Sequence, residues 1–192
     1  RKLRPYWRKT GWDVSDLLKA SLSEAEDIKT RCAAFDEDIM MDLSKAGGNA
    51  YAELAALSFR QCIAAHKLVA DLDGNPLFFS KENFSNGCMG TVDVTYPSSP
   101  FFLLFNPTLL EAQITPILDY AASGRWKFPF APHDLGRYPL ANGQVYGGGE
   151  ATEIDQMPVE ECGNMLLLVA ALCKTRSDYS YAQRYWPLLK QW

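Results

Sequence analysis

Two adjacent glycines, Gly47 and Gly48, separate two long segments that both have the apolar spacing of helices. In residues 23–45, apolar side chains recur at three- and four-residue steps, which is the period of one helix face. Ser23 begins a capping-box pattern, so we expect this helix to start there, after a shorter helix over about residues 13–21. Because glycine commonly caps the end of a helix, the pair predicts a turn into a second helix.

The second segment, residues 49–70, is apolar on most faces, which predicts a long buried helix. Its polar residues Glu53, Arg60 and Gln61 share one face and form either a strip pointing at a cavity or a buried ion pair. His66, near the end of this segment, is expected to cap the helix or to be partly exposed.

Further helices are expected where proline suits the first helical position. Pro107 and Pro158 predict helices over about residues 106–123 and 158–174, and a last helix begins near Asp178. Residues 77–81 predict a short strand. Two stretches rich in Gly and Pro complete the chain, a loop over residues 82–100 and the stretch 125–164, which runs into the start of a helix.

These elements predict an all-α fold of helical hairpins, with long loops and short strands on one face. About three hairpins are expected, which is half of a six-hairpin ring, the (α/α)6 toroid. No repeat of about 34 or 40 residues is visible, so the chain does not resemble a solenoid. A length of 192 residues predicts one domain over residues 1–192. The chain starts without Met and ends within a helical pattern, so we expect it to be a fragment of a longer protein.

The composition excludes several classes of protein. Hydrophobic residues make up 47% of the chain and aromatic residues 12%, which is enough for a packed core. The net charge is -4 and the only basic run is the opening RKLRPYWRK, so we expect no nucleic-acid partner. No apolar run reaches about 18 residues, so no membrane span is expected.

The 5 cysteines form no CxxC pair and no cluster with histidine, so the sequence predicts no cofactor and assigns no metal ligand. It leaves open whether the acid-rich stretch 125–164 binds a metal ion. Four cysteines have apolar neighbours in predicted helices, which predicts buried free thiols: Cys32, Cys62, Cys162 and Cys173.

The stretch 125–164 is the strongest candidate for a functional site. A loop longer than about 15 residues is uncommon in a compact domain unless it has a function, and binding groups concentrate on such loops. This one contains His133 and Asp134, followed by several carboxylates. Asp134 is a candidate general acid or base, with His133 beside it. Alternatively, Asp134 braces the loop by accepting backbone N–H groups.

Asp93 and Glu160 are further catalytic candidates. Asp93 lies near Ser98 and Ser99, but no base accompanies these serines, so a serine nucleophile is not favoured. Glu160 and the adjacent Glu161 follow a proline at the start of a helix. The helix dipole favours acids there, which explains both residues without a catalytic role.

Four residues are candidates for substrate binding. Arg137 suits an α-carboxylate, with a surface salt bridge as the alternative. Glu150 suits an α-ammonium group or could form a carboxylate pair with Asp134. Trp126 and Tyr96 can contribute to a pocket, although aromatic residues between helices often only pack.

Three blocks carry a resemblance to a known family: SKENFSNGCMGTVDVTYPSSPFFL, FAPHDLGRYPLANGQVYGGGE and MPVEECGNMLLLVAALC. In their order and spacing they resemble the six-helical-hairpin region of the glutaminase A family of fungi and bacteria, over about residues 12–192. The resemblance implies the first half of an (α/α)6 toroid, between a β-rich domain and further helices of the same polypeptide. It also implies hydrolysis of a small molecule, L-glutamine, to L-glutamate and ammonia by a secreted or periplasmic enzyme. It assigns no catalytic residue.

Two other functions stay open. Residues 133–136 look like a piece of toroid glycoside hydrolases, and two carboxylates across a wide, aromatic-lined cleft would favour an oligosaccharide substrate. A buried arginine beside an acid in a small pocket would instead favour an amino acid. A non-catalytic helical scaffold or binding domain would be favoured if no polar groups converge from the two long loops. Because half a ring cannot enclose a cavity, we expect the fragment alone to be inactive.

Overall fold

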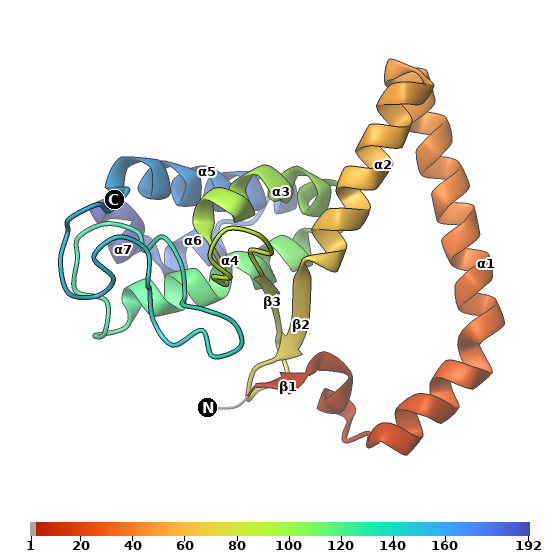
Figure 1. Ribbon diagram of the computed structural model, residues 1–192, viewed down its shortest axis with the longest axis horizontal. Helices are drawn as coiled ribbons and strands as arrows, with labels where there is room; N and C mark the ends of the chain where they lie inside the picture. The colour runs from red at the N-terminus through yellow and green to blue at the C-terminus, as the bar shows by residue number, and fades with distance from the viewer. Residues whose placement is uncertain (1–2) are drawn as a thin grey trace. The chain divides into compact units, whose positions relative to one another are not determined.

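A computed structural model describes residues 3–192, which are mainly helical, as the sequence predicts (Figure 1). Arg1 and Lys2, at the start of the basic opening run, lie outside the described residues. The chain divides into two compact units, Arg1–Ala64 and Ala65–Trp192, and each is described by itself. The sequence carries no signal for this boundary, because it lies inside the segment that was expected to form one long helix.

The first unit begins with β1 Arg4–Pro5 and the 3-10 helix η1 Tyr6–Thr10. A long helical hairpin follows, made of α1 Val14–Gly47 and α2 Asn49–Ala64. The prediction of two helices before the glycine pair was wrong, because α1 is continuous. Its capping box lies earlier than expected: Asp13 accepts a hydrogen bond from the backbone N–H of Asp16, and Asp16 accepts one from that of Asp13. Ser23 lies inside α1, where its hydroxyl donates to the carbonyl of Ala20.

The glycine pair ends α1 as predicted, and Gly48 adopts a φ of 81°. The two helices contact each other through residues such as Phe35 and Phe59, whose ring centroids lie 6.1 Å apart. The prediction that the second helix is buried was wrong: in its described part Ala52 is the only buried residue. Apolar spacing shows which face can be covered, but not whether a partner covers it. The polar strip of Glu53, Arg60 and Gln61 is exposed as well, so it forms no buried ion pair.

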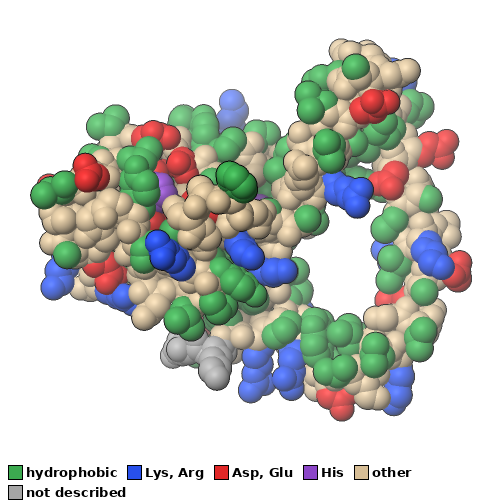
Figure 2. Space-filling view, viewed as in Figure 1, with side chains coloured by type: hydrophobic (Ala, Val, Ile, Leu, Met, Phe, Trp, Pro, Cys, Tyr) green, Lys and Arg blue, Asp and Glu red, His purple; other side chains and the backbone are tan. Residues whose placement is uncertain are grey.

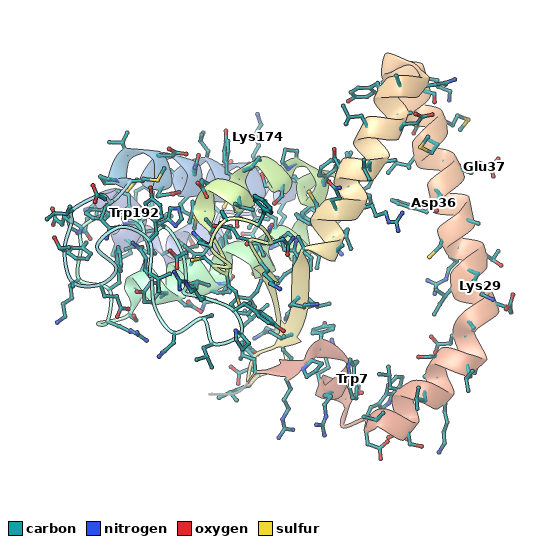
Figure 3. All side chains as sticks on the ribbon, viewed as in Figure 1. Trp7, Lys29, Asp36, Glu37, Lys174 and Trp192 are labelled. Carbon is teal, nitrogen blue, oxygen red and sulfur yellow. The ribbon has the colours of Figure 1, made fainter. Side chains whose placement is uncertain are left out.

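Hydrophobic and charged side chains alternate over the surface of this hairpin (Figure 2). None of the 34 described residues of α1 is buried. Lys29 and Glu37 project from this helix (Figure 3), and Lys29 pairs with Glu26 at 2.7 Å. Cys32 is exposed and Cys62 only half-buried, so the expectation of buried thiols was wrong for Cys32 and not fully met by Cys62.

The second unit begins with an antiparallel hairpin of β2 His66–Ala70 and β3 Pro76–Ser80. The sequence predicts β3, but residues 66–70 were expected to be helical, which was wrong. The Asp71 carboxylate accepts hydrogen bonds from the backbone N–H groups of Asp73 and Asn75 and so closes the turn. This turn aligns the two segments, and pairing then overrides the helical preference of the first.

His66 is a core residue and not a helix cap, so that expectation was also wrong. Its ring stacks on Phe78 with centroids 4.3 Å apart and meets the edge of Phe102 at 5.3 Å. Its Nε2 atom lies 2.7 Å from the amide nitrogen of Gln113, which satisfies the buried ring.

Helix α3, Val92–Phe105, occupies the second half of the loop that was expected before it, so this part of the loop prediction was wrong. Pro97 and Pro100 lie inside the helix, although proline cannot donate the helical hydrogen bond to the carbonyl four residues earlier. The Ser99 hydroxyl donates to the carbonyl of Tyr96, the group that Pro100 leaves without its usual partner. A side-chain hydrogen bond therefore substitutes for the one that the proline removes.

Two helices confirm the predictions made from proline positions, α4 Pro107–Ala122 and α5 Pro158–Arg176. The last helix, expected from near Asp178, is divided into two short helices, α6 Ser180–Arg184 and α7 Trp186–Gln191. Helices α3, α4 and α5 contact one another, and β3 contacts α4. The largest fully buried side chains form this core: Phe102, Leu110, Ile114, Ile117, Leu118, Met165, Leu168 and Leu172. Cys88, Cys162 and Cys173 are buried here as well. Over residues 3–192, no helix is both long and apolar enough to cross a membrane.

Candidate functional site

Main-chain hydrogen bonds join the two long loops of the second unit. Met89 donates its N–H to the carbonyl of Gly136 at 2.9 Å, and Leu135 donates to the carbonyl of Met89 at 2.9 Å. Val92, the first residue of α3, donates to the carbonyl of His133 at 2.9 Å. The start of α3 is thus fixed beside the His133 segment, and the two long loops meet here.

Glycine is required at two points of this junction. Gly136 has a φ of 103°, and a Cβ atom there would lie 2.5 Å from the carbonyl oxygen of Gly143. Gly90 has a φ of 62°, and a Cβ atom there would lie 2.6 Å from Leu135. Any other residue would be strained in these conformations, and at Gly90 the added Cβ atom would also push against the other loop.

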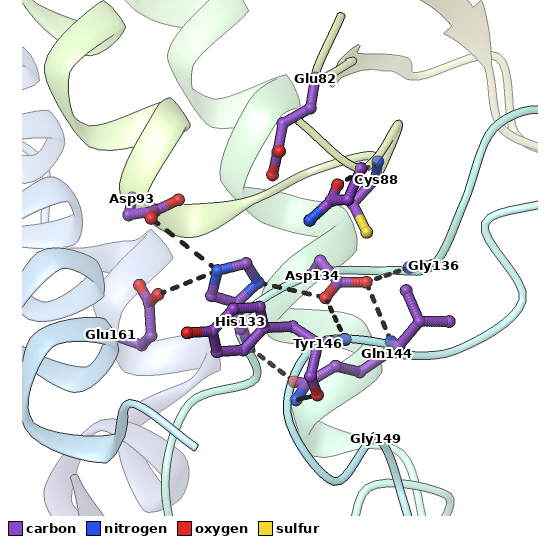
Figure 4. Close-up of polar contacts among 12 residues, drawn as sticks. Glu82, Cys88, Asp93, His133, Asp134, Gly136, Gln144, Tyr146, Gly149 and Glu161 are labelled. Carbon is purple, nitrogen blue, oxygen red and sulfur yellow. Dashed lines mark hydrogen bonds and ion pairs between the residues drawn. The ribbon is translucent and has the colours of Figure 1, made fainter. Parts of the chain in front are cut away.

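Asp134 is a fully engaged hydrogen-bond acceptor. One oxygen accepts from the N–H groups of Gly136 and Val145, at 2.7 and 3.2 Å, and the other from the N–H of Tyr146 and from His133 Nδ1, both at 3.1 Å (Figure 4). Burial alone would raise the pKa of Asp134, but these hydrogen bonds outweigh burial and lower it. A carboxylate held in this way braces the loop, which is the alternative to general acid–base catalysis that the sequence left open.

His133 is buried, with 3% of its surface exposed, and is held from three sides. Its backbone N–H donates to Gln144 Oε1 at 2.7 Å, its Nδ1 contacts Asp134, and its ring stacks on Tyr146 with centroids 3.9 Å apart. The opposite ring atom, Nε2, is the one that faces other side chains.

Two carboxylates face Nε2 of His133. Asp93, in the first turn of α3, places Oδ2 at 3.8 Å from it, and Glu161, in the first turn of α5, places Oε1 at 3.9 Å (Figure 4). Both separations are too long for hydrogen bonds. One ligand atom from each of these three residues lies within 4.8 Å of the other two. We call Asp93, His133 and Glu161 the acid–histidine cluster.

Glu161 is an unusual carboxylate. It is 0% exposed, and neither of its oxygens has a hydrogen-bond partner among the described residues. Burial raises the pKa of Glu161 to about 8, and the charges of Asp93 and Glu160 add to the rise. The charge of His133 opposes it, as does a polar interaction with the Asn164 side chain that falls short of hydrogen-bond geometry.

The pKa of His133 is raised as well, although burial acts to lower it. The hydrogen bond to Asp134 and the charges of Glu161 and Asp93 outweigh burial. A buried histidine and a buried carboxylate with shifted pKa values are typical of functional sites.

The cluster contains Glu161 and not Glu160, which is exposed. The periodicity of α5 carries the signal that separates the two. Glu161 lies four and seven residues before Met165 and Leu168, which are buried, whereas Glu160 lies seven residues before Leu167, which is exposed. Counting along this apolar face would have predicted the buried acid.

None of the four residues predicted to bind substrate belongs to the acid–histidine cluster. Arg137 and Tyr96 are exposed. Trp126 is buried and donates its indole N–H to the carbonyl of Phe130, so it packs in the core. Glu150 forms an ion pair with Arg125 at 2.7 Å and accepts a hydrogen bond from Tyr120. The contacts of Trp126 and Glu150 brace the long loop.

Comparison with known proteins identifies the family. A family model described as the glutaminase A six helical-hairpin domain matches residues 48–192. The chain is 37% identical over 158 residues to glutaminase A of Aspergillus oryzae, covering 82% of this chain and 22% of the relative. It is 34% identical over 167 residues to a probable glutaminase of Arthroderma benhamiae, covering 86% of this chain and 19% of the relative.

No solved structure matches the chain. The chain spans about a fifth of the length of the two curated relatives, 22% and 19%. The family model nevertheless covers most of the chain, including both loops that build the acid–histidine cluster. On these matches, the chain belongs to the glutaminase A family.

Proposed function

We propose that this chain supplies the hydrolytic site of a longer, secreted enzyme that converts L-glutamine to L-glutamate and ammonia. The observation that carries the proposal is the acid–histidine cluster, in which His133 faces Asp93 and the buried, unpaired Glu161. The names of both relatives support glutamine as the substrate.

The chemistry of the cluster suits hydrolysis of an amide. A water oxygen bonds to the carboxamide carbon, the C–N bond breaks, and the nitrogen leaves as ammonia. This requires a group that accepts a proton from water and a group that returns a proton to the leaving nitrogen. Carboxylates and an imidazole within 4.8 Å of one another can share these tasks. Asp134 acts as a positioning residue, because it orients the His133 ring through Nδ1.

The arrangement favours this proposal over the two alternatives. A scaffold would need no convergence of polar groups from the two long loops, yet three segments meet at His133. Two carboxylates that face each other across a wide cleft would favour an oligosaccharide substrate. Here the two carboxylates instead approach the same ring nitrogen of His133. The sign that would favour an amino acid, a buried arginine beside an acid, is not seen here: among the described residues, Asp93 and Glu161 pair with His133 and not with an arginine. We therefore assign the contacts to the α-carboxylate of glutamine to other parts of the longer protein.

The test compares adjacent glutamates in the full-length protein. Glu161→Gln keeps the size of the side chain and removes its acid–base chemistry, so we expect kcat/KM for ammonia release from glutamine to fall about 100-fold or more. Glu160→Gln, one residue away and exposed, is the matched control and should keep activity near that of the wild type. Thermal unfolding of both variants verifies that they are folded. Wild-type turnover in a folded Glu161→Gln variant would refute the proposal.

A further inference from the structure

We propose that Asp93, His133 and Glu161 bind one divalent first-row metal ion, such as Zn²⁺ or Mn²⁺, through one nitrogen and two carboxylate ligands. The three residues come from α3, the long loop and α5, so the site exists only in the folded chain. One imidazole and two carboxylates form a ligand set that suits these ions.

The spacing of the three groups fits a shared ion better than direct contact. His133 Nε2 lies 3.8 Å from Asp93 Oδ2 and 3.9 Å from Glu161 Oε1. Two ligands that each lie about 2.1 Å from one ion are separated by roughly 3 to 4 Å. These two distances exceed those of hydrogen bonds and lie at the upper end of this range, and all three ligand atoms lie within 4.8 Å of one another, so the three side chains surround a common point.

Glu161 provides an independent reason to place a ligand at this point. Both of its oxygens are buried without a hydrogen-bond partner, and Oδ1 of Asp93 is buried without one as well. Unpaired buried carboxylates are strongly unfavourable, so buried acids are paired or coordinate metals. When both carboxylates are ionised, as metal ligands are, they and a neutral imidazole carry a charge of about -2, which a divalent cation neutralises.

The surroundings prepare His133 to be a ligand. Asp134 already accepts backbone N–H groups, and an ionised carboxylate can only accept, so His133 Nδ1 carries the hydrogen that it donates to Asp134. The lone pair of a neutral His133 is then on Nε2, which faces the two carboxylates. A carboxylate that fixes the tautomer of a metal-bound histidine is a recurrent arrangement in metalloproteins. Tyr146 and Gln144 hold the ring and the backbone in place.

The surrounding groups also distinguish this site from a cluster of surface acids. Asp93 has a side chain that is 35% exposed, while His133 and Glu161 are almost fully enclosed. An ion can therefore be reached from the Asp93 side and still keep a position for water, as catalytic metal sites do. Such an ion would activate that water for the hydrolysis proposed above. The metal site does not rest on that function, because its test measures binding.

The experiment uses the full-length protein stripped with a chelator and then titrated with Zn²⁺ or Mn²⁺ by calorimetry, with metal content verified by mass spectrometry. We expect the wild type and the control Glu160→Gln to bind one ion per chain. Glu161→Gln and His133→Ala should bind none. Asp134→Asn should weaken affinity about 10- to 100-fold without removing the site. Asp93→Asn, at the most exposed ligand, is the variant to use if the buried substitutions prevent folding.

The outcomes separate this inference from the proposed function. Equal metal stoichiometry in the wild type and in folded Glu161→Gln or Asp93→Asn would overturn the metal site, as would the absence of Zn²⁺ and Mn²⁺ binding by the folded wild type. Metal binding that depends on these residues, together with no ammonia release from glutamine, would refute the function and leave the site standing.

Discussion

At the scale of single residues, His133 and Asp134 have opposite roles although they are adjacent in sequence. Asp134 uses both oxygens to hold the loop and the imidazole, whereas His133 presents a free ring nitrogen to Asp93 and Glu161. The sequence indicates the pair but not this division. Which side chain faces the site depends on backbone N–H groups donated by residues about ten positions further along the loop.

Glu150 provides a prediction of pH dependence at this scale. Burial acts to raise its pKa, but hydrogen bonds from Tyr120 and Arg125 and the charges of Arg125 and Lys127 outweigh burial and lower the pKa from 4.5. Because the pKa of Glu150 is lower in the folded state than in the unfolded state, the ionised carboxylate stabilises the protein at pH values above its unfolded-state pKa. This contribution is lost as the pH falls through the folded value.

We therefore expect Glu150→Gln to lower Tm at pH 7 by an amount equivalent to about 1 kcal/mol or less, since both Glu150 and its partner Arg125 are partly exposed. The difference between variant and wild type should shrink as the pH falls below 4.5, the ordinary value. Thermal unfolding of both proteins across this pH range measures it. A difference in Tm that is the same at pH 7 and at pH 3 would contradict the assignment.

At the scale of elements, local signals predicted helix starts well and missed effects that arise from pairing. Pro107 and Pro158 located α4 and α5, because proline at the first helical position is a property of the sequence alone. Residues 66–70 become a strand only because β3 lies opposite, and that contact is not local. In the same way, Pro100 predicted a loop but lies in α3, where Ser99 compensates for it.

The junction of the two long loops yields a prediction at the element scale. Gly136→Ala combines a φ of 103° with a Cβ atom 2.5 Å from the Gly143 carbonyl, so we expect the free energy of unfolding to fall by about 1 to 3 kcal/mol or more. Gly124→Ala is the matched control, because Gly124 has no atom within 4 Å of the added Cβ. Urea unfolding of both variants measures the difference. Equal stabilities would show that the junction does not depend on Gly136.

At the scale of the whole molecule, many large apolar side chains of the hairpin of α1 and α2 are exposed, among them Leu22, Leu54 and Leu57. Contiguous exposed apolar surface of this kind usually marks a site of interaction. A groove of about 760 Å³ between the two helices is lined by residues including Phe35, Ile39, Leu57 and Ile63. The family name implies further hairpins, and the curated relatives are about five times longer, since the chain spans 22% and 19% of them. The sequence predicted both the hairpin and its apolar face, but a single chain cannot reveal what covers that face.

We expect other segments of the longer polypeptide to cover this groove, as the predicted toroid requires. Cys32 is exposed and lines the groove, so it reports on this directly. Its labelling by a thiol reagent should be at least about tenfold slower in the full-length protein than in the 192-residue chain. Cys173, buried in the core of the second unit, should stay unlabelled in both and so verifies folding. Equal labelling rates for Cys32 would show that the groove remains open.

The loop junction also has a consequence for how this family can diversify. The hydrogen bonds that join Met89 to Leu135 and Gly136 are made by main-chain atoms, so most side chains can be exchanged there without breaking them. Gly90 and Gly136 are restricted by their backbone conformation, and Met89 and Leu135 by their burial. Mutation can therefore alter the surface of both loops, and with it the molecules that the protein accepts, while His133 and Asp93 keep their positions.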